Sequence, residues 1–449
     1  MESHSRRSFI KSSATLLSAV GAGVSRMSAA SDKVNIGFIG FGIRGNYLGE
    51  HFKVLPEVNI VAVADLYDGY LQNARETIDD RIQTTKDYRV VLDRKDIDAV
   101  IVATPEHWHT RIVLDAISAG KDIYIEKPMT WSVEEGYHIM NAMKNSNRIL
   151  QVGSGRKSLP TTAKAKEIVK SGVLGKINLV RYSDFRNSID GAWGYPIPPD
   201  ASKATVDWGQ FLGSTPKIPW SPERFFRWRC WWEYSGGIAT DLFVHQLTAL
   251  HEILSLKVPK SAVSNGGIYR WNDGRTVPDV MGTLFEYPGD FLLEMCVSLG
   301  STKGHIQAHG EAIMGSEATM LIGGPDGGIV LYREDPNQVR RQGARHFPRT
   351  LREQFEAGQK AKEPLPIPKD KEVVEVPRDP AWPTHQQFFV RSIKQRTPSV
   401  EDAEVGHNAA TACHMANYAF RHNCKAGIDP HTGKLIALQT GSGRARAGN

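Results

Sequence analysis

A glycine-rich turn between a buried strand and a helix constrains the fold of this chain more than any other feature. Residues 34–39 form a short apolar run with the β-branched content of a buried strand. The run enters the pattern Gly40-x-Gly42-x-x-Gly45, and a helical segment follows. Such glycines allow a tight turn, a close approach of backbone N–H groups to a pyrophosphate, and close packing of the helix on the strand. The pattern predicts a phosphate site at the N-terminus of that helix.

A second apolar run ends in a carboxylate at the spacing that a dinucleotide site requires. Residues 58–64 are typical of a strand, and Asp65 follows Gly45 by twenty residues. An acid at this position can hold the hydroxyl groups of an adenosine ribose. The order of strand, glycines, helix, strand and acid therefore predicts a dinucleotide-binding half-domain. Asp65 favours NAD over NADP because its charge would repel a 2′-phosphate, although Arg44, inside the turn, would soften that preference.

Strands and helices continue to alternate up to residue 153. Further strands are predicted over 97–105, 121–125 and 149–153, and a loop at 106–109 precedes a helix at 110–119. This alternation predicts a doubly wound parallel sheet, the Rossmann arrangement, in which ligands bind at the carboxyl ends of the strands. The residues that mark these ends, and are expected to converge on one crevice, are Gly40, Asp65, Thr104, Glu126 and Gly153.

The length of 449 residues points to a second domain with a core of its own. Strands such as 281–287 and 291–295 alternate in polarity, which predicts an α+β domain with an open, mainly antiparallel sheet. The fold class is therefore α/β. The expected divisions are a signal peptide at 1–30, a Rossmann domain at 31–155, a substrate-binding domain at 156–430 with C-terminal helices at 384–423, and a tail at 431–449.

The first thirty residues resemble a twin-arginine export signal. Arg6 and Arg7 are followed by Phe9 and Lys11, then by a weakly apolar segment at 13–24 and a small-residue cleavage motif, Ser28-Ala29-Ala30. The apolar segment is too short to anchor stably in a membrane, so no stable membrane span is predicted. We expect a periplasmic or otherwise exported protein. Because this route carries folded proteins, a dinucleotide captured in the cytoplasm could travel with the chain.

Charge and cysteine content argue against two other kinds of site. The formal net charge is +6, and half of it lies in residues 1–30, with no long basic run beyond them. Nucleic acid is therefore not a predicted partner. The four cysteines, Cys230, Cys296, Cys413 and Cys424, show neither metal-ligand spacing nor a disulfide framework, and no metal site is predicted.

These motifs together resemble the glucose–fructose oxidoreductase/inositol dehydrogenase (Gfo/Idh/MocA) family. The resemblance rests on the glycine turn, Asp65, the sequence 103–105 followed by two histidines, and above all on Glu126-Lys127-Pro128. It extends over residues 34 to about 430. The resemblance implies a cofactor site formed by Gly40, Gly42, Ile43, Arg44, Gly45, Asp65, Thr104, Pro105, His107, His109, Glu126 and Lys127. It also implies a contact of Glu126 with the nicotinamide ribose.

A second element of the resemblance supplies catalytic candidates. Asp241 and His245 are four residues apart, so on a helix both project from one face. The pair resembles the family's Asp-x-x-x-His element, which implies that Lys127 and His245 contact the reacting hydroxyl while Asp241 orients His245 or a neighbouring hydroxyl. We favour His245 as the base, because its ordinary pKa is near neutrality. Lys127, whose pKa burial and the charge of NAD⁺ would lower, would polarise the oxygen; the reverse assignment is open.

The substrate candidates lie at the start of the second domain and in an aromatic segment. Residues 193–232 are rich in Trp, Pro and Arg, and most of them are expected to pack as a surface excursion on the sheet. Flat aromatic rings can also stack on the apolar faces of pyranoses. The residues proposed to contact substrate are Arg156, Arg229, Trp231 and Tyr234.

The resemblance implies an exported NAD(P)-dependent oxidoreductase that takes a hydride from a secondary hydroxyl of a sugar, polyol or glycoside. An alternative is an NAD-dependent glycoside hydrolase or lyase that oxidises transiently and recycles a bound NAD. Export favours the alternative, because free NAD is scarce outside the cytoplasm. The NAD-dependent glycosidases of the family, however, depart from Glu-Lys-Pro and carry a Tyr/His element that differs from residues 241–245. A non-catalytic binding protein is less favoured, because Lys127, Asp241 and His245 are all present. An open sheet face commonly pairs with another subunit, so a homo-oligomer is expected.

Overall fold

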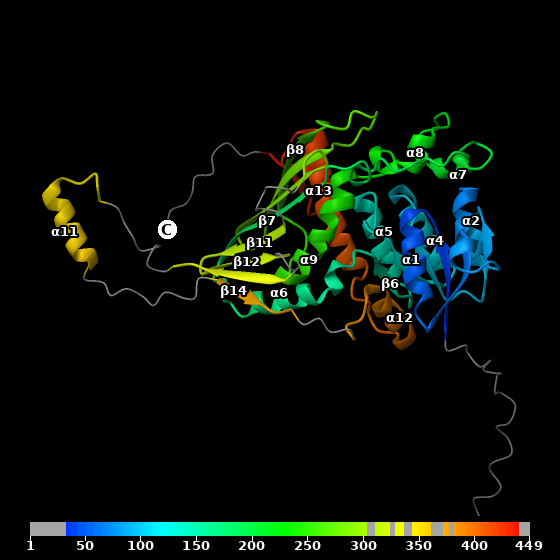
Figure 1. Ribbon diagram of the computed structural model, residues 1–449, viewed down its shortest axis with the longest axis horizontal. Coiled ribbons are helices and arrows are strands. Elements are labelled where there is room, and N and C mark those ends of the chain that lie inside the picture. The colour runs from blue at the N-terminus through cyan, green and yellow to red at the C-terminus, as the bar shows by residue number, and fades with distance from the viewer. Residues whose placement is uncertain are drawn as a thin grey trace, which may run out of the picture.

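The computed structural model describes residues 33–302, 310–323, 328–335, 344–360, 371–376 and 381–439. The predicted signal peptide lies outside these residues. Two bodies lie side by side in Figure 1, an N-terminal domain in blue and cyan and a second domain built on a large green and yellow sheet. None of the described helices has both the length and the apolar content needed to cross a membrane.

The N-terminal domain is a six-stranded parallel sheet with the strand order β3-β2-β1-β4-β5-β6. Its interior strands are buried on both faces, as their continuous apolar sequences require. One apolar cluster contains Phe38 and Phe52, and a separate cluster on the other face contains Ile39 and Val113. The predicted doubly wound sheet is thereby confirmed. The elements are β1 (Val34–Ile39), α1 (Ile43–Lys53), β2 (Val58–Ala64), α2 (Asp68–Thr77), β3 (Gln83–Thr85), α3 (Tyr88–Asp93), β4 (Ala99–Val102), α4 (Glu106–Ser118), β5 (Asp122–Ile125), α5 (Val133–Lys144) and β6 (Leu150–Val152).

The second domain contains a ten-stranded sheet with the order β14-β13-β12-β11-β7-β10-β9-β8-β15-β16. Its pairings are antiparallel except that β7 and β10 run parallel. Helices cover one face, and the other is open: Phe285 and Leu293 are fully buried, whereas Leu284 and Leu292 are each 39% exposed. The predicted open, mainly antiparallel sheet is confirmed. The strands are β7 (Ile177–Phe185), β8 (Ser261–Gly267), β9 (Val280–Tyr287), β10 (Phe291–Ser298), β11 (Gly310–Gly315), β12 (Ala318–Ile322), β13 (Ile329–Arg333), β14 (Lys371–Val374), β15 (Ala426–Ile428) and β16 (Leu435–Ala437).

Several helices complete the second domain. The π-helical turn η4 (Ala239–Phe243) leads directly into α9, and α13, orange-red in Figure 1, lies between the two domains. The elements are η1 (Arg156–Ser158), α6 (Pro160–Lys170), η2 (Asp190–Ala192), α7 (Trp208–Leu212), α8 (Pro222–Phe226), η3 (Trp228–Cys230), η4, α9 (Val244–Leu254), α11 (Arg349–Lys360), α12 (His385–Gln395) and α13 (Ala403–His422).

The end of the chain departs from the predicted domain limits in two places. Helix α12 packs in the core of the N-terminal domain, where the Phe389 ring lies 6.4 Å from Phe52 and 5.6 Å from Tyr124 between centroids. Strand β16 lies in the segment predicted to be a tail, and joins the large sheet through β15. Sequence periodicity reveals an apolar helix face but not the surface that it covers.

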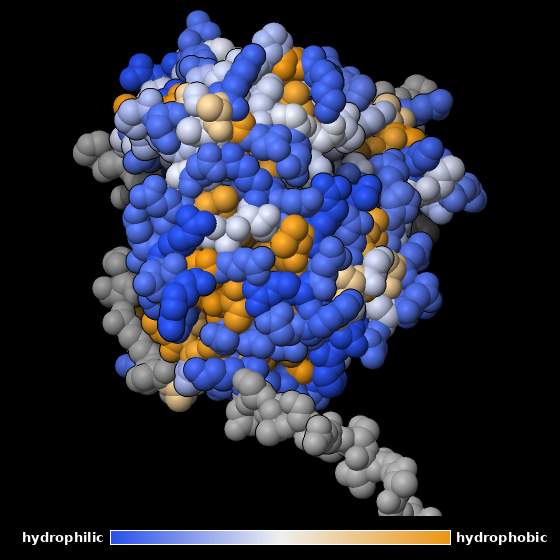
Figure 2. Space-filling model, turned by 90° about the vertical axis from the view of Figure 1, so that its right-hand side faces the viewer, coloured by the Kyte–Doolittle hydropathy of each residue, from blue (hydrophilic) through white to orange (hydrophobic). Residues whose placement is uncertain are grey.

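Residues 186–235, which include the aromatic segment at 193–232, cross from the second domain onto the N-terminal domain, and we call them the strap. The backbone N–H of Asp207 donates to the Leu66 carbonyl at 2.9 Å, and that of Asp68 donates to the Thr205 carbonyl at 3.0 Å. The Phe226 and Tyr67 rings meet edge to face with centroids 5.1 Å apart. Helices α7 and α8 consequently lie near α2 in Figure 1. Figure 2 views this end of the molecule, where hydrophilic residues predominate and apolar ones form small groups.

Candidate active site

The glycine turn has the close backbone packing that its sequence predicts. Gly40 has a φ of +90°, and a Cβ there would lie 2.7 Å from the Ala103 carbonyl. A Cβ on Gly45 would lie 2.2 Å from the Gly40 oxygen. Gly42 is the N-cap of α1 and has no side chain to occupy the space before the helix. The first N–H groups of α1 thus face a site from which larger side chains are excluded, as a bound pyrophosphate requires.

Asp65 follows β2 and is fixed by the backbone around it. Its Oδ2 accepts a hydrogen bond from the Phe41 N–H at 2.6 Å, and its Oδ1 accepts one from the Tyr67 N–H at 3.0 Å. Burial raises the pKa of Asp65 to about 6, and the backbone donors oppose that rise. The carboxylate is therefore mostly ionised at neutral pH and held in place for ribose hydroxyls.

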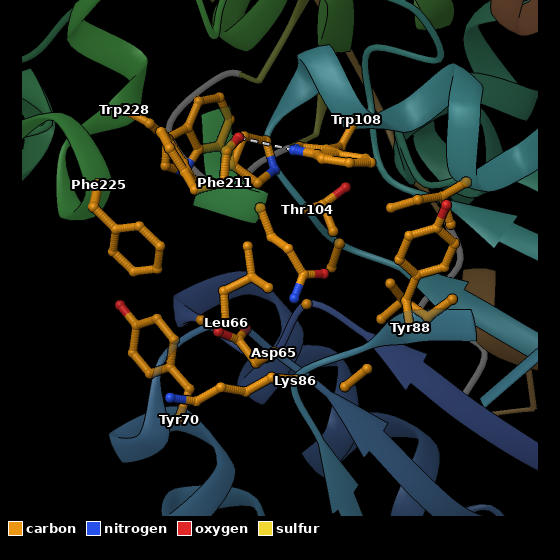
Figure 3. Close-up of a pocket in the computed structure, with 18 residues that line it drawn as sticks. Asp65, Leu66, Tyr70, Lys86, Tyr88, Thr104, Trp108, Phe211, Phe225 and Trp228 are labelled. Carbon is orange, nitrogen blue, oxygen red and sulfur yellow. Dashed lines mark hydrogen bonds between the residues drawn. The ribbon is translucent and has the colours of Figure 1, made fainter. Parts of the chain in front are cut away.

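A pocket with about 730 Å³ of empty space, part of it open to solvent, lies beside Asp65. Figure 3 shows it between the strand ends of the N-terminal domain and the strap, with Asp65 and Thr104 on one side and Phe211 and Trp228 on the other. The Trp108 indole N–H donates to the Phe211 carbonyl at 2.9 Å and ties the two sides together. The lining residues that sequence reasoning missed come mainly from the strap and the loops after β2 and β3: Leu66, Tyr70, Lys86, Tyr88, Gln210, Phe211, Phe225 and Trp228.

Glu126 marks the other half of the strand-end crevice. The Arg44 Nε donates to its Oε1 at 2.7 Å, and a Cβ on Gly153 would lie 2.8 Å from the same oxygen. The strand-end positions expected to converge do so, around the pocket and around Glu126. Ile43, at the start of α1, is 58% exposed. The Lys127–Pro128 peptide is cis.

The segment predicted to be a loop at 106–109 is the first turn of α4. Pro105 is its N-cap, and the acidic side chain of Glu106 suits the positive end of the helix dipole. The buried Glu106 carboxylate accepts from the Ser235 hydroxyl, the Gly236 N–H and the Thr240 hydroxyl at 2.8 to 2.9 Å. Burial raises its pKa to about 7. Glu106, which sequence reasoning missed, thus joins α4 to the turn that precedes Asp241.

The two histidines of this turn make internal contacts. The Nε2 of His107 lies 2.8 Å from the Phe211 carbonyl in the strap. The ring nitrogens of His109 lie 2.8 Å from the Pro128 carbonyl and 2.9 Å from the Thr104 carbonyl. His109 is 1% exposed, so its role in the structure is to connect the loops that follow β4 and β5.

Lys127 and Asp241 form a buried ion pair across the domain junction. The Lys127 Nζ donates to both Oδ1 and the main-chain carbonyl of Asp241, each at 2.7 Å. Arg229 Nε lies 3.1 Å from the same Oδ1, and the Trp193 indole N–H donates to Oδ2 at 2.8 Å. Burial alone would raise the pKa of Asp241, but the charges of Lys127 and Arg229 hold it well below its ordinary value.

Asp241 and His245 do not lie on one regular α-helix, which corrects the prediction from their four-residue spacing. Asp241 lies in the π-helical turn η4, and His245 is the second residue of α9. Such turns often occur at functional sites. Asp241 is engaged by Lys127, Arg229 and Trp193, whereas the Nδ1 of His245 lies 3.2 Å from the Ser154 carbonyl. The group that orients the His245 ring is therefore this carbonyl.

The protonation state of His245 follows from its surroundings. A carbonyl oxygen only accepts hydrogen bonds, so Nδ1 carries the proton and Nε2 keeps its lone pair. Burial, followed by the charge of Lys127, lowers the pKa of His245 well below 6.5. The pKa is thus lower than the near-neutral value expected from the residue type. The Nε2 of this neutral imidazole has no hydrogen-bond partner among the described residues, so it can accept a proton.

The four substrate candidates lie in different surroundings. Trp231 is 6% exposed and Tyr234 is 1% exposed, and both belong to the apolar core of the second domain. Arg229 pairs with Asp241 and lies over the Trp228 ring at 4.2 Å. Arg156, which follows β6, lines a separate polar cavity in the second domain.

Comparison with known proteins agrees with this architecture. Residues 34–154 match the model of the Gfo/Idh/MocA family, described as an oxidoreductase family with an NAD-binding Rossmann fold. A glycosyl hydrolase family 109 protein of Shewanella sp. (strain MR-4) is 32% identical over 156 residues, which is 32% of this chain and 33% of that protein. The matched part thus spans about a third of the length of this curated relative.

Solved structures extend the likeness to both domains. Levoglucosan dehydrogenase in complex with NADH and levoglucosan superposes with a TM-score of 0.61 at 17% identity, over 88% of this chain and 98% of that one. The WlbA dehydrogenase of Bordetella pertussis, in complex with NADH and UDP-GlcNAcA, gives 0.61 at 16% identity, over 88% and 98%. The fold is thus that of two-domain Rossmann oxidoreductases. The N-terminal domain, over residues 34–154, is similar to the Gfo/Idh/MocA family.

Proposed function

We propose that the protein is an NAD-dependent oxidoreductase that removes a hydride from a secondary hydroxyl of a sugar, polyol or glycoside. The observation that carries the proposal is the position of Lys127. It follows Glu126 at the strand-end edge of a dinucleotide-binding domain, and it pairs with Asp241 of the second domain close to His245. A cation and a neutral base meet where a substrate between the two domains would present its hydroxyl.

The residues present fit a dinucleotide. Backbone atoms occupy the space that a Cβ on Gly40 or Gly45 would need, so the turn is as tight as a pyrophosphate site requires. The Phe41 N–H holds the Asp65 carboxylate in place for a ribose. When bound, NAD⁺ supplies a hydride acceptor. Lys127, anchored by Asp241, donates a hydrogen bond to the substrate oxygen and stabilises its developing negative charge. The Nε2 of His245 takes the hydroxyl proton, and the Ser154 carbonyl holds the ring in the required tautomer.

The preference for NAD over NADP is part of the proposal. Asp65 would repel a 2′-phosphate, and two cations that could offset this repulsion are already engaged. The Arg44 guanidinium lies 2.7 Å from Glu126, and the Lys86 ammonium, which also lines the pocket, lies 2.8 Å from Asp68. Replacement of Asp65 by Asn keeps one acceptor for the backbone donors and removes the charge. We expect Asp65→Asn to lower the affinity for NAD and to narrow the preference over NADP; equal affinities for both in the unaltered protein would overturn this part.

The experiment that tests the proposal begins with the purified protein, without added cofactor. It is denatured, and any released dinucleotide is identified by mass spectrometry. The native protein is then incubated with a panel of sugars, polyols and aryl glycosides while absorbance of reduced nicotinamide is followed. Bound NAD and a single turnover of reduction support the oxidoreductase. Absence of both a bound dinucleotide and any affinity for one would contradict the proposal.

One observation favours the second candidate, a glycoside hydrolase or lyase that recycles its NAD. The strap covers the pocket beside Asp65, so release of a dinucleotide requires the contacts of residues 205–211 with the N-terminal domain to break. A retained cofactor suits a redox-neutral cycle. The relative of glycosyl hydrolase family 109 points in the same direction. Release of a product sugar from an aryl glycoside without net reduction would identify this activity.

We also propose that the protein is exported and forms a homo-oligomer. Export is supported by the twin-arginine sequence, and cleavage after Ala30 in cells would test it. Association is supported by the open sheet face, where Leu284, Leu292 and Tyr332 are each 39% exposed. Light scattering after size exclusion should show an oligomer for the unaltered protein and a smaller species for Leu284→Lys.

A further inference from the structure

A polar cavity in the second domain contains a carboxyl group that the fold leaves without a partner. Glu311 lies on β11 opposite Tyr182 of β7, on the sheet face that the helices cover, and it is 5% exposed. Its carboxyl group makes neither a hydrogen bond nor an ion pair with any residue that the structure describes, and its Oε1 is buried. Burial of an unpaired carboxyl group is costly, and an apolar side chain would serve the core better. A ligand is the simplest reason for its presence.

The cavity holds further groups suited to a ligand. Gln246 follows His245 on α9, is 3% exposed, and also has a buried side-chain oxygen without a partner among the described residues. Arg156 extends into the cavity from η1, and the Arg186–Asp184 ion pair, at 2.8 Å, completes the polar lining. About 740 Å³ of empty space is present. Two acceptors and a guanidinium that have no partner among the described residues thus face one space.

The cavity adjoins the candidate active site. Burial raises the pKa of Glu311 to about 7, and the positive charge of Arg156 opposes that rise. The same charge contributes to the low pKa of His245, after burial and Lys127. The two sites also share neighbouring residues: the Ser154 carbonyl, which lies 3.2 Å from the His245 Nδ1, precedes Arg156 by two residues, and Gln246 follows His245. A substrate whose hydroxyl reaches His245 would extend its remote end toward Glu311.

The charges of the lining indicate the chemistry of the ligand. Arg156 and Arg186 disfavour an ammonium group, and Glu311 and Asp184 disfavour a carboxylate. Each hydroxyl of a neutral diol can donate to an unsatisfied acceptor and accept from a guanidinium. We propose that this cavity binds a vicinal diol of the substrate, with Glu311 and Gln246 accepting from its two hydroxyl groups and Arg156 donating to them. This inference rests on the proposed function and makes Glu311 a specificity-determining residue.

Two isomeric probes test the proposal on the purified protein. Trans-1,2-cyclohexanediol and trans-1,4-cyclohexanediol share the same ring and hydroxyl count, and differ in the spacing of the hydroxyls. Their affinities are measured by saturation-transfer NMR titration. We expect the 1,2-isomer to bind more tightly, and Glu311→Gln to weaken its binding about tenfold, because a neutral amide oxygen accepts a hydrogen bond more weakly than a carboxylate does. Glu317→Gln, an exposed position on the same hairpin, serves as the control and should leave binding unchanged.

Thermal unfolding separates this role from a structural one. Glu311→Gln removes a buried carboxyl group, so its midpoint should equal or exceed that of the unaltered protein. Equal affinities for the two diols, or full affinity in Glu311→Gln, would overturn the proposal. Because diol binding requires no hydride transfer, the diol affinities can be compared even if the protein shows no turnover. Absence of a bound dinucleotide would count against the proposed function, whereas sugar oxidation without diol discrimination would count against this inference alone.

Discussion

The Lys127 ammonium nitrogen lies 2.7 Å from the Asp241 carboxylate and 2.7 Å from the carbonyl of the same residue. The two side chains are only 9% and 12% exposed and belong to different domains. The ion pair therefore aligns the two halves of the molecule and holds a cation at the strand-end edge of the Rossmann domain. The position of the Lys127 ammonium group therefore depends on how the two domains are arranged.

Replacement of Lys127 by Met should abolish most turnover while the dinucleotide stays bound. Met keeps the length of the side chain but cannot donate to the substrate oxygen, and loss of one such donor typically costs about 10²- to 10³-fold in rate. Single-turnover reduction and dinucleotide content are the measurements. Lys166→Met, which removes an ion pair with Glu252 elsewhere in the second domain, is the matched control. Near-normal reduction by Lys127→Met would rule out the role assigned to the ammonium group.

The rate of reduction should be insensitive to pH from 8 down to about 6.5 and should fall in more acidic solution. Burial and Lys127 lower the pKa of His245 well below 6.5, so the imidazole remains neutral across that range and can accept the hydroxyl proton. Single-turnover rates at saturating substrate give the profile. His245→Asn should remove the acidic limb and leave a low, flat rate. An apparent pKa above 7 on that limb would favour Lys127 as the base.

The free energy of unfolding should depend on pH through the buried carboxyl group of Glu106. Its folded-state pKa, about 7, lies above the ordinary value of 4.5, so the folded state binds more protons between these limits. The free energy of unfolding therefore falls as pH rises from 4.5 to 7, by about 3 kcal/mol for this group. Urea titrations at both pH values give the free energy of unfolding of the unaltered protein and of Glu106→Gln. The fall between pH 4.5 and pH 7 should be larger in the unaltered protein by about 3 kcal/mol. Glu134→Gln, on the exposed face of α5, should show no such difference.

Loosening of the strap should release the dinucleotide faster. The buried Tyr67 hydroxyl donates to the Asp200 carboxylate and fastens the strap to the N-terminal domain beside the pocket. Tyr67→Phe removes this hydrogen bond without creating a cavity, and we expect about a tenfold faster loss of NAD. Dinucleotide content during dialysis gives the rate. Tyr332→Phe, on the open sheet face, is the control; equal loss from both variants would show that the strap does not retain the cofactor.

Features with a local signature were predictable from the sequence. The glycine turn, Asp65 and the alternating apolar runs each depend on residues close together in the chain, because backbone sterics and strand or helix periodicity are local. The same reasoning, with the family resemblance, placed Lys127, Asp241 and His245 among the catalytic candidates. The same reasoning did not predict that His109, Trp231 and Tyr234 are buried. Residue type indicates what a side chain can contact, but not whether the fold buries it.

The amino-acid sequence by itself therefore determined the Rossmann half-domain, the open sheet and the residue types available for hydride transfer. Only the tertiary structure decided that α12 joins the first domain, that the strap covers the pocket beside Asp65, and that the Ser154 carbonyl orients His245. It also decided that Glu311 faces a cavity without a partner among the described residues. These relationships join residues distant in sequence, and packing of complementary surfaces selects them, which no local pattern records.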